Sequence, residues 1–189
     1  MRYRPDQKAK AKTALLQAGG RALRSNGFNG MGVDGLAAAA GVTSGAFYSN
    51  FASKEALLRD VIDSGLGEPF LSADTTEVGL KSYLRAWLSD YISREHRVHP
   101  GDGCVMPSLS ADVARSGPDV RLAYARKMQE LVARISGALD GTEGERQRKA
   151  RSIVALMVGS IAISRALPDG ADADNVIDTA LQTALALVD

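Results

Sequence analysis

The chain has 189 residues, of which 45% are apolar, 24% charged and 5% aromatic, and its 23 basic residues nearly balance its 22 acidic ones. This composition is typical of a globular protein of one or two domains, and the single cysteine, Cys104, excludes an internal disulfide and a cysteine-rich zinc module. No apolar run reaches the roughly 18 residues of a membrane span, and the N-terminus lacks the apolar stretch of a secretory signal, so we expect a cytoplasmic protein without a membrane partner.

The charge is distributed unevenly along the chain. The first 65 residues carry nine basic and five acidic side chains, whereas acidic residues are in excess over the remainder. A basic first third favours a polyanionic partner for that part of the chain. The alternative interpretation is a basic helix that faces only solvent.

The chain is predicted to be all-α, because no stretch alternates apolar and polar residues over a run of β-branched side chains. A first helix is expected over about 6–26, where alanines and leucines recur at three- and four-residue spacing and Gly27 follows as a stop signal. The adjacent Gly19 and Gly20 weaken this helix, by roughly 1 kcal/mol each relative to alanine. Close packing against a neighbouring helix would explain them.

Two short helices follow, over about 33–40 and 44–50, separated by a turn at Gly41. Val33, Leu36 and Ala37 would face the core from the first of them. Phe47 and Phe51 lie four residues apart and would anchor the second. Two short helices joined by such a turn form a helix-turn-helix, whose second helix can enter the major groove of DNA.

The first helix and the two short helices would form a three-helix head, and a fourth helix is expected over about 53–64, with Ser53 as its N-cap. Glycines and a proline then mark a boundary, which gives a predicted DNA-binding domain over 1–65 and a ligand-binding and dimerisation domain over 66–189. Longer helices in the second domain bring the expected total to about nine; they span approximately 76–97, 105–115, 118–139, 143–167 and 172–188.

The outward-facing residues of the second short helix and its cap favour DNA over solvent. They are small or polar and none is charged, whereas a helix that faces only solvent normally carries Lys and Glu. Such a surface can approach bases closely and offer hydroxyl and amide groups to their edges. Lys54 and the nearby N-terminal amides are placed for phosphate groups. The outward-facing residues are Thr43, Ser44, Gly45, Ala46, Tyr48, Ser49 and Asn50.

This region resembles the DNA-binding region of the tetracycline-repressor (TetR/AcrR) family of bacterial one-component regulators. The resemblance covers roughly the first third of the chain, in which many fixed residue types recur at fixed spacings. The matching elements are Leu15-Leu16 through Gly27-Phe28, Val33, Leu36-Ala37, Ala40-Gly41-Val42, Gly45, Phe47-Tyr48, Phe51 and Ser53-Lys54-Glu55-Ala56-Leu57-Leu58.

The resemblance implies a homodimer that binds a palindromic DNA operator and is released when a small-molecule effector enters the body. It further implies that bases are met by Ser44, Gly45, Ala46 and Asn50, and phosphates by Thr43, Tyr48 and Lys54, with Ser49 on the same surface. One departure is Met31-Gly32, where the family often has two hydroxyl residues, and this puts a hydroxyl–phosphate contact there in doubt. Five basic residues either follow the DNA or stay in solvent: Arg2, Arg4, Lys8, Lys10 and Lys12.

A ligand pocket is expected among the helices that follow the head. Taken singly, each candidate residue suits an ordinary core, but together they supply the apolar wall with sparse polar tips that is typical of a small-molecule site. The candidates are Tyr83, Trp87, Tyr91, Cys104, Met106, Leu109, Tyr124 and Met128.

Cys104 stands at the entry to a helix, whose first amides favour a thiolate. The run from Pro100-Gly101 to Val120-Arg121 resembles the electrophile-responsive branch of the family, like the repressors of N-ethylmaleimide reductase. Two interpretations stay open, namely a thiol that senses electrophiles and a small buried residue that only packs. His96 and His99 are near in sequence, but no orienting group or metal-ligand spacing accompanies them, so we expect no enzyme, no metal and no cofactor.

The last two predicted helices are the most apolar of the chain. They suit either a hairpin buried within one subunit or a subunit interface, and the second is the working hypothesis. The expected interface residues are Ile153, Val154, Met157, Ile161, Ile177, Leu181 and Leu185. The sequence thus predicts a dimeric, ligand-responsive transcriptional repressor, with an activator, a constitutive DNA binder and, more remotely, a cysteine-dependent enzyme as alternatives.

Overall fold

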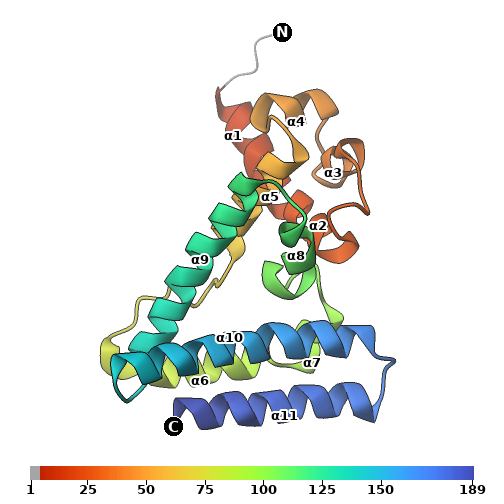
Figure 1. Ribbon diagram of the computed structural model, residues 1–189. Coiled ribbons are helices and arrows are strands. Elements are labelled where there is room, and N and C mark those ends of the chain that lie inside the picture. Colours follow the sequence, from red (N-terminus) through yellow and green to blue (C-terminus); the bar gives the residue numbers. More distant parts are fainter. Residues whose placement is uncertain (1–4) are drawn as a thin grey trace. The chain divides into compact units, whose positions relative to one another are not determined.

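A computed structural model describes residues 5–189, and the side chains of 7–76 and 79–189. Over this range the chain contains helices and no strand, which confirms the predicted all-α fold (Figure 1). The elements in order are α1 (Pro5–Ala14), η1 (Leu15–Gly19), α2 (Gly20–Asn26), α3 (Val33–Ala39), α4 (Ser44–Asn50), α5 (Lys54–Gly65), α6 (Glu77–Tyr91), α7 (Arg94–Val98), α8 (Val105–Ala114), α9 (Pro118–Gly137), α10 (Glu143–Ala166) and α11 (Ala171–Val188).

The chain divides into two compact units. The first comprises residues 1–66 with 100–125, and the second comprises 67–99 with 126–189. The break after Leu66 lies next to the boundary expected after residue 65. However, residues 100–125 pack with the head and not with the rest of the predicted body. The compact units therefore differ from the predicted functional domains, whose separate roles stay a prediction.

The first helical rod runs through α1, η1 and α2, and it explains the two adjacent glycines. The backbone keeps right-handed helical angles through Ala14, Gly19 and Gly20, with one turn of π-helix between α1 and α2. A Cβ atom would lie 3.3 Å from Leu57 Cδ2 at Gly19 and 3.1 Å from Val61 Cγ2 at Gly20. The glycines thus allow α5 to approach the rod closely, as the sequence analysis suggested.

The short helices α3 and α4 begin and end within about one residue of their expected positions. Gly32 is the N-cap of α3 and provides no side-chain hydrogen bond there. Gly41 has φ +65, a left-handed conformation that favours glycine. Leu36 and Ala37 are buried, as expected for the inner face of α3. The turn and the inward-facing residues therefore build the predicted helix-turn-helix.

Helix α8 joins the first unit through contacts with the end of α2. Arg24 donates hydrogen bonds from Nε (2.8 Å) and Nη2 (2.6 Å) to the carbonyl oxygen of Gly101. A Cβ atom at Gly101 would lie 2.7 Å from Ser25 Oγ, so a larger residue would not fit without a shift. Gly65 also lies close to Val105. These contacts are the physical reason why 100–125 groups with the head.

In the second unit, α10 and α11 run side by side in opposite directions (Figure 1). The single helix expected over 76–97 is instead two helices, α6 and α7, separated at Ile92-Ser93. Ser93 caps α7 by accepting a hydrogen bond from the His96 amide, at 3.1 Å. The prediction of one helix was wrong because the apolar spacing of α6 concealed this cap signal.

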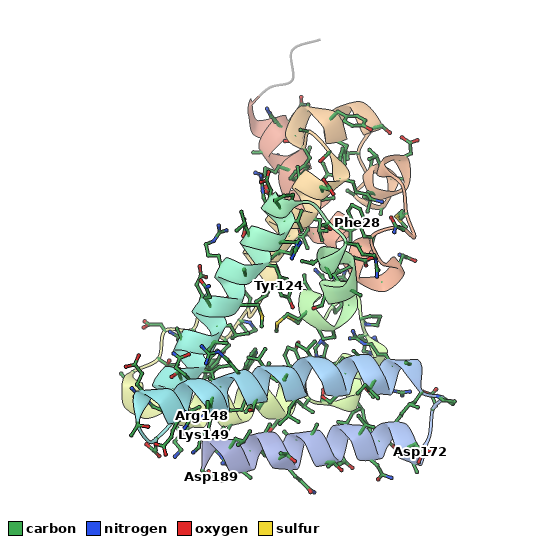
Figure 2. All side chains as sticks on the ribbon, in the orientation of Figure 1. Phe28, Tyr124, Arg148, Lys149, Asp172 and Asp189 are labelled. Atoms are coloured by element: carbon green, nitrogen blue, oxygen red, sulfur yellow. The ribbon has the colours of Figure 1, made fainter. Side chains whose placement is uncertain are left out.

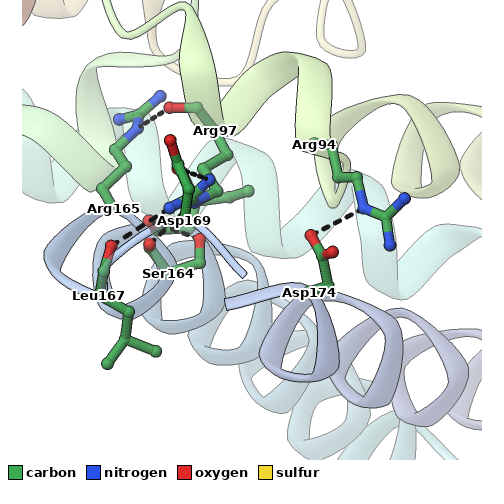
Figure 3. Close-up of polar contacts among 8 residues, drawn as sticks. Arg94, Arg97, Ser164, Arg165, Leu167, Asp169 and Asp174 are labelled. Atoms are coloured by element: carbon green, nitrogen blue, oxygen red, sulfur yellow. Dashed lines mark hydrogen bonds and ion pairs between the residues drawn. The ribbon is translucent and has the colours of Figure 1, made fainter. Parts of the chain in front are cut away.

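Two arginines fasten α7 to the end of α10 (Figure 3). Arg97 donates to the carbonyl oxygens of Ser164 (2.8 Å) and Leu167 (3.2 Å) and pairs with Asp169 (2.7 Å). Arg165 donates in turn to the carbonyl oxygens of Arg97 (3.0 Å) and His96. Since the last carbonyls of a helix have no partner within it, these side chains satisfy groups that would otherwise depend on water.

Candidate nucleic-acid interface

Helix α4 is held from behind by aromatic packing and from its start by a cap. Phe47 and Phe51 are 0% and 3% exposed, and their ring centroids lie 5.8 Å apart. Thr43 accepts a hydrogen bond from the Ala46 amide through its side chain, at 3.1 Å. These contacts fix the rotation of the helix about its axis, which determines the residues that face outward.

The outer face of α4 contains most, but not all, of the residues assigned to DNA. Tyr48 is 60% exposed, and Thr43, Gly45 and Ser49 are also exposed. Ser44 and Asn50 are half-buried. Ala46 is 2% exposed and belongs to the core, so its assignment to DNA was wrong. The reason is geometric, because Ala46 precedes Phe47 on the inner edge of the helix.

Several polar groups of this face already have partners within the protein. Ser44 Oγ donates to Asp34 Oδ1 of α3 at 2.5 Å, which ties the two helices of the motif together. Ser49 Oγ donates to the Ala46 carbonyl oxygen at 2.9 Å, and Asn50 Nδ2 donates to the same oxygen at 2.8 Å. These bonds orient the side chains before any partner arrives.

Lys54 is turned inward, toward the loop that precedes α3. Its Nζ donates to the carbonyl oxygens of Phe28 (2.5 Å) and Met31 (3.1 Å) and lies 4.2 Å from the centroid of the Phe28 ring. The phosphate contact expected for Lys54 stays a prediction, and the structure gives this ammonium a second role that the sequence did not indicate.

The basic residues of α1 differ in whether they are exposed or already have a partner within the protein. Lys8 and Lys10 are exposed on α1, whereas Lys12 pairs with Asp60 at 3.2 Å and lies 5.7 Å from the centroid of the Phe51 ring. Arg2 and Arg4 lie outside the described residues. The two exposed lysines therefore remain the better candidates for phosphate contacts.

Cys104 lies at the N-cap of α8 in a nearly buried position, 9% exposed. Burial lowers the pKa of the neighbouring Arg24 guanidinium, and the Cys104 thiol acts in the opposite direction. In the same unit, Tyr124 (labelled in Figure 2) shares a 2.7 Å hydrogen bond with Ser110, and burial raises the pKa of its phenol. The thiol thus lies at the start of a helix and close to the Arg24 guanidinium.

The eight predicted ligand residues do not form one group within either compact unit. Cys104, Met106, Leu109 and Tyr124 belong to the first unit, and the other four belong to the second. In the second unit Trp87 and Tyr91 pack edge to face, 5.5 Å between centroids, and Phe70 stacks on Trp87 at 4.6 Å. A ligand site at these residues stays a prediction, and the aromatic stack serves as core of the second unit.

Most of the predicted dimer residues are buried within a single chain. Ile153, Val154, Met157, Ile161 and Ile177 are at most 3% exposed, because α10 and α11 pack against each other and against the rest of their unit. These side chains therefore offer almost no surface to a second chain, and the subunit interface itself stays a prediction. Leu181 and Leu185 are half-buried, and Ile163, which the sequence analysis did not select, is 55% exposed.

Asp112 is a contact residue to which the sequence analysis gave no role. Its carboxylate, on α8, accepts a hydrogen bond from the Phe28 amide at 3.1 Å, and Arg115 pairs with it at 3.1 Å. The two partners lie 84 residues apart in the sequence. No local pattern indicates such a pairing, so only the fold could reveal it.

Both histidines have partners of their own. His96 Nδ1 lies 2.7 Å from the Tyr91 carbonyl oxygen, and His99 pairs with Glu95 at 3.1 Å. Among the described residues, no cluster of three or more His, Cys, Asp or Glu side chains is suited to a metal ion. None of the described helices is long and apolar enough to cross a membrane.

Comparison with known proteins finds a family match within the first unit. A sequence profile described as "Bacterial regulatory proteins, tetR family" matches residues 15–61, which extend from η1 to α5. The chain is similar to the "HTH-type transcriptional repressor NemR" of Escherichia coli (strain K12), at 27% identity over 77% of this chain and 79% of that protein.

Solved structures have the same fold. The reduced form of Escherichia coli NemR superimposes with a TM-score of 0.72 at 20% identity, covering 95% of this chain and 97% of that chain. A TetR transcriptional regulator from Legionella pneumophila gives 0.73 at 14% identity, covering 96% and 98%. FadR from Bacillus subtilis, in complex with stearoyl-CoA, gives 0.68 at 15% identity, covering 94% and 99%.

Proposed function

We propose a specific role for this chain, which belongs to the tetR family of bacterial regulatory proteins and is a transcriptional regulator. It binds a palindromic operator as a homodimer. It represses transcription until a small apolar or electrophilic molecule releases it from the operator. The observation that carries the proposal is the outer face of α4. This face is uncharged, carries hydroxyl groups and a 60% exposed tyrosine, and is held rigidly by Phe47 and Phe51.

The contacts of α4 with DNA follow from this face. Gly45 allows close approach, while Ser44 and Asn50 offer polar groups to base edges. Thr43 and Tyr48 would contact phosphates, together with the exposed Lys8 and Lys10 of α1. Ser49 borders the same surface. Because phosphate contacts release counterions, affinity should fall steeply with salt.

The homodimer is supported by what α10 and α11 leave exposed. Ile163 on α10 and the half-buried Leu181 and Leu185 on α11 replace the buried residues as the proposed interface. Gly159 lies near Ile163 on α10, and a Cβ atom there would meet nothing within 4 Å, so a second helix could approach closely. Two heads then match a palindrome with half-sites about one helical turn apart.

The effector is proposed to act at Cys104. Cys104 is the single thiol of the chain, and it lies at the N-cap of α8 and beside Arg24. The similarity to a repressor solved in a reduced form supports a redox- or electrophile-dependent response. The 9% exposure of Cys104 favours the alternative, a packing residue in a regulator whose effector binds elsewhere or which binds DNA constitutively.

The test is binding to the DNA upstream of the chain's own gene, measured by fluorescence anisotropy beside bulk DNA. We expect the upstream DNA to bind at least about 10³-fold more tightly. Equal affinity for both DNAs would refute a specific operator. Asn50→Ala should reduce this ratio, since it removes a base contact, and an equal loss on both DNAs would argue against Asn50 as a base-reading residue.

A second arm adds N-ethylmaleimide as the electrophile. It should release the wild-type chain from its operator and leave Cys104→Ser bound. Release of both proteins to the same extent would remove Cys104 from the response, and release of neither would favour the constitutive binder.

A further inference from the structure

The peptide of Phe28 is held from both sides by charged side chains of different helices. Phe28 follows Gly27, which ends α2 with φ +74, and begins the loop that leads to α3 (labelled in Figure 2). Its amide donates to Asp112 of α8 at 3.1 Å, and its carbonyl oxygen accepts from Lys54 of α5 at 2.5 Å. We call this arrangement, formed by Asp112, Phe28 and Lys54, the Phe28 clamp.

We propose that Asp112 and Lys54 are positioning residues for DNA binding, and that Lys54 acts through the Phe28 clamp and not through a phosphate group. The inference rests on the proposed function, since it concerns how the helix-turn-helix is held for DNA. It also gives α8, which begins after Cys104, a direct contact with the loop before α3.

The geometry assigns the Lys54 ammonium to the loop. Two of its three N–H groups are used by the carbonyl oxygens of Phe28 and Met31, and the charge lies 4.2 Å from the centre of the Phe28 ring. A phosphate would have to compete with these contacts or share the remaining N–H. The ammonium therefore binds the loop at both its beginning and its end.

Asp112 has two partners, and its hydrogen bond with the Phe28 amide is the stronger of the two contacts. Its side chain is 13% exposed, so its hydrogen bond with the Phe28 amide is shielded and charge-assisted. Arg115, the other partner, is 68% exposed, and such exposed ion pairs contribute little. The hydrogen bond with Phe28 is therefore the contact through which Asp112 positions the loop before α3.

The clamp matters for α4 because the start of α3 has no side-chain cap of its own. Gly32 caps α3 only through its backbone, and Met31, just before it, is held by Lys54. Asp34 in the first turn of α3 accepts the hydrogen bond of Ser44 in α4. A chain of contacts thus connects α8 to α4 through the Phe28 loop.

The first experiment measures the salt dependence of operator affinity in the full chain. Lys54→Met keeps an unbranched side chain of similar length and removes the charge and the donors. We expect affinity to fall about tenfold while the slope of log affinity against log salt stays unchanged. A slope shallower by about 0.9 would identify a phosphate contact and overturn the proposal.

The second experiment separates the two partners of Asp112. Asp112→Leu should weaken operator binding about tenfold, whereas Asp112→Asn, which keeps an acceptor for the Phe28 amide, should stay within about twofold of wild type. Arg115→Ala is the matched control and should also be unchanged. Because both residues act on one peptide, the double variant Lys54→Met with Asp112→Leu should bind the operator as tightly as the single variant that binds less tightly. A loss of affinity in the double variant equal to the sum of the two single losses would overturn the clamp.

Amide exchange of the full chain, followed by NMR without DNA, tests the clamp independently. The Phe28 amide should exchange at least about tenfold faster in Asp112→Leu than in wild type and remain protected in Asp112→Asn. Unchanged exchange in Asp112→Leu would overturn the clamp, with circular dichroism verifying that the variant is folded. If wild type binds no operator, the proposed function and the DNA role of Lys54 and Asp112 fail together, while exchange still decides whether the clamp exists.

Discussion

Helix α4 and the α10–α11 pair were both predicted from the sequence to face a partner, but the predicted contact residues differ in their exposure. In α4 the polar residues lie outside and the two phenylalanines inside, apart from the buried Ala46. In α10 and α11, five of the seven apolar residues assigned to a partner are buried within their own chain. The polar face of a helix indicates which residues are exposed. An apolar face indicates that its residues are buried, but not whether the same chain or a second chain covers them.

The largest effect that sharpens this comparison is expected inside α4 itself. Phe47→Ala should destabilise the first unit by about 3–5 kcal/mol, because Phe47 is fully buried and its removal leaves a cavity. Tyr48→Ala is the matched control, and it should change stability by less than about 0.5 kcal/mol, since Tyr48 is exposed. Urea denaturation measures both, and similar losses would mean that α4 is rotated relative to this structure.

A comparable experiment on α10 tests whether its apolar residues serve the chain or a partner. Ile161→Ala should cost about 2–5 kcal/mol, because Ile161 is fully buried in a single chain. The loss should persist at protein concentrations where the dimer dissociates. A loss that disappears on dilution would return Ile161 to the subunit interface.

The stability of the second unit should depend on pH because of His96. Burial lowers the pKa of His96 below its ordinary value of 6.5, so the unfolded chain binds a proton before the folded one does. The contribution of His96 to stability is therefore complete above pH 6.5 and is lost as the pH falls below 6.5, by about 1.4 kcal/mol for each unit of the pKa difference. His96→Gln should show a flatter profile in urea denaturation at several pH values, and an identical slope would exclude His96 as the cause.

The smallest effect is expected at the polar contact of α8 with α9. Tyr124→Phe removes the hydrogen bond with Ser110 and should cost about 1 kcal/mol, since Ser110 keeps its bond with the Met106 carbonyl oxygen. Thermal unfolding measures the loss. A cost above about 3 kcal/mol would indicate that Tyr124 supports the α8–α9 packing beyond this single bond.

The helices of the head could be predicted from the sequence because their signals are local. Gly41, Thr43 and Ser53 each determine a turn or a cap within a few residues of themselves, and the structure has them in these roles. The break between α6 and α7 also has a local signal in the N-cap Ser93, although the apolar spacing on either side fits one continuous helix.

The remaining features depend on contacts between distant parts of the chain. The inward turn of Lys54, the pairing of Asp112 with Phe28 and the packing of residues 100–125 on the head join segments that no sequence window contains. The buried state of Met157 and Ile161 likewise depends on which helix lies opposite. The sequence pattern selected Lys54, Met157 and Ile161 but not their partners, and it gave no role to Asp112.

The central claim is that the exposed face of α4 binds DNA, and Tyr48 tests it most directly. Operator affinity of Tyr48→Ala should be compared with that of Leu122→Ala, the truncation of a 67% exposed apolar side chain on α9. We expect Tyr48→Ala to bind about tenfold more weakly and Leu122→Ala to bind like wild type. Wild-type affinity in Tyr48→Ala, or the same loss in both variants, would contradict the account.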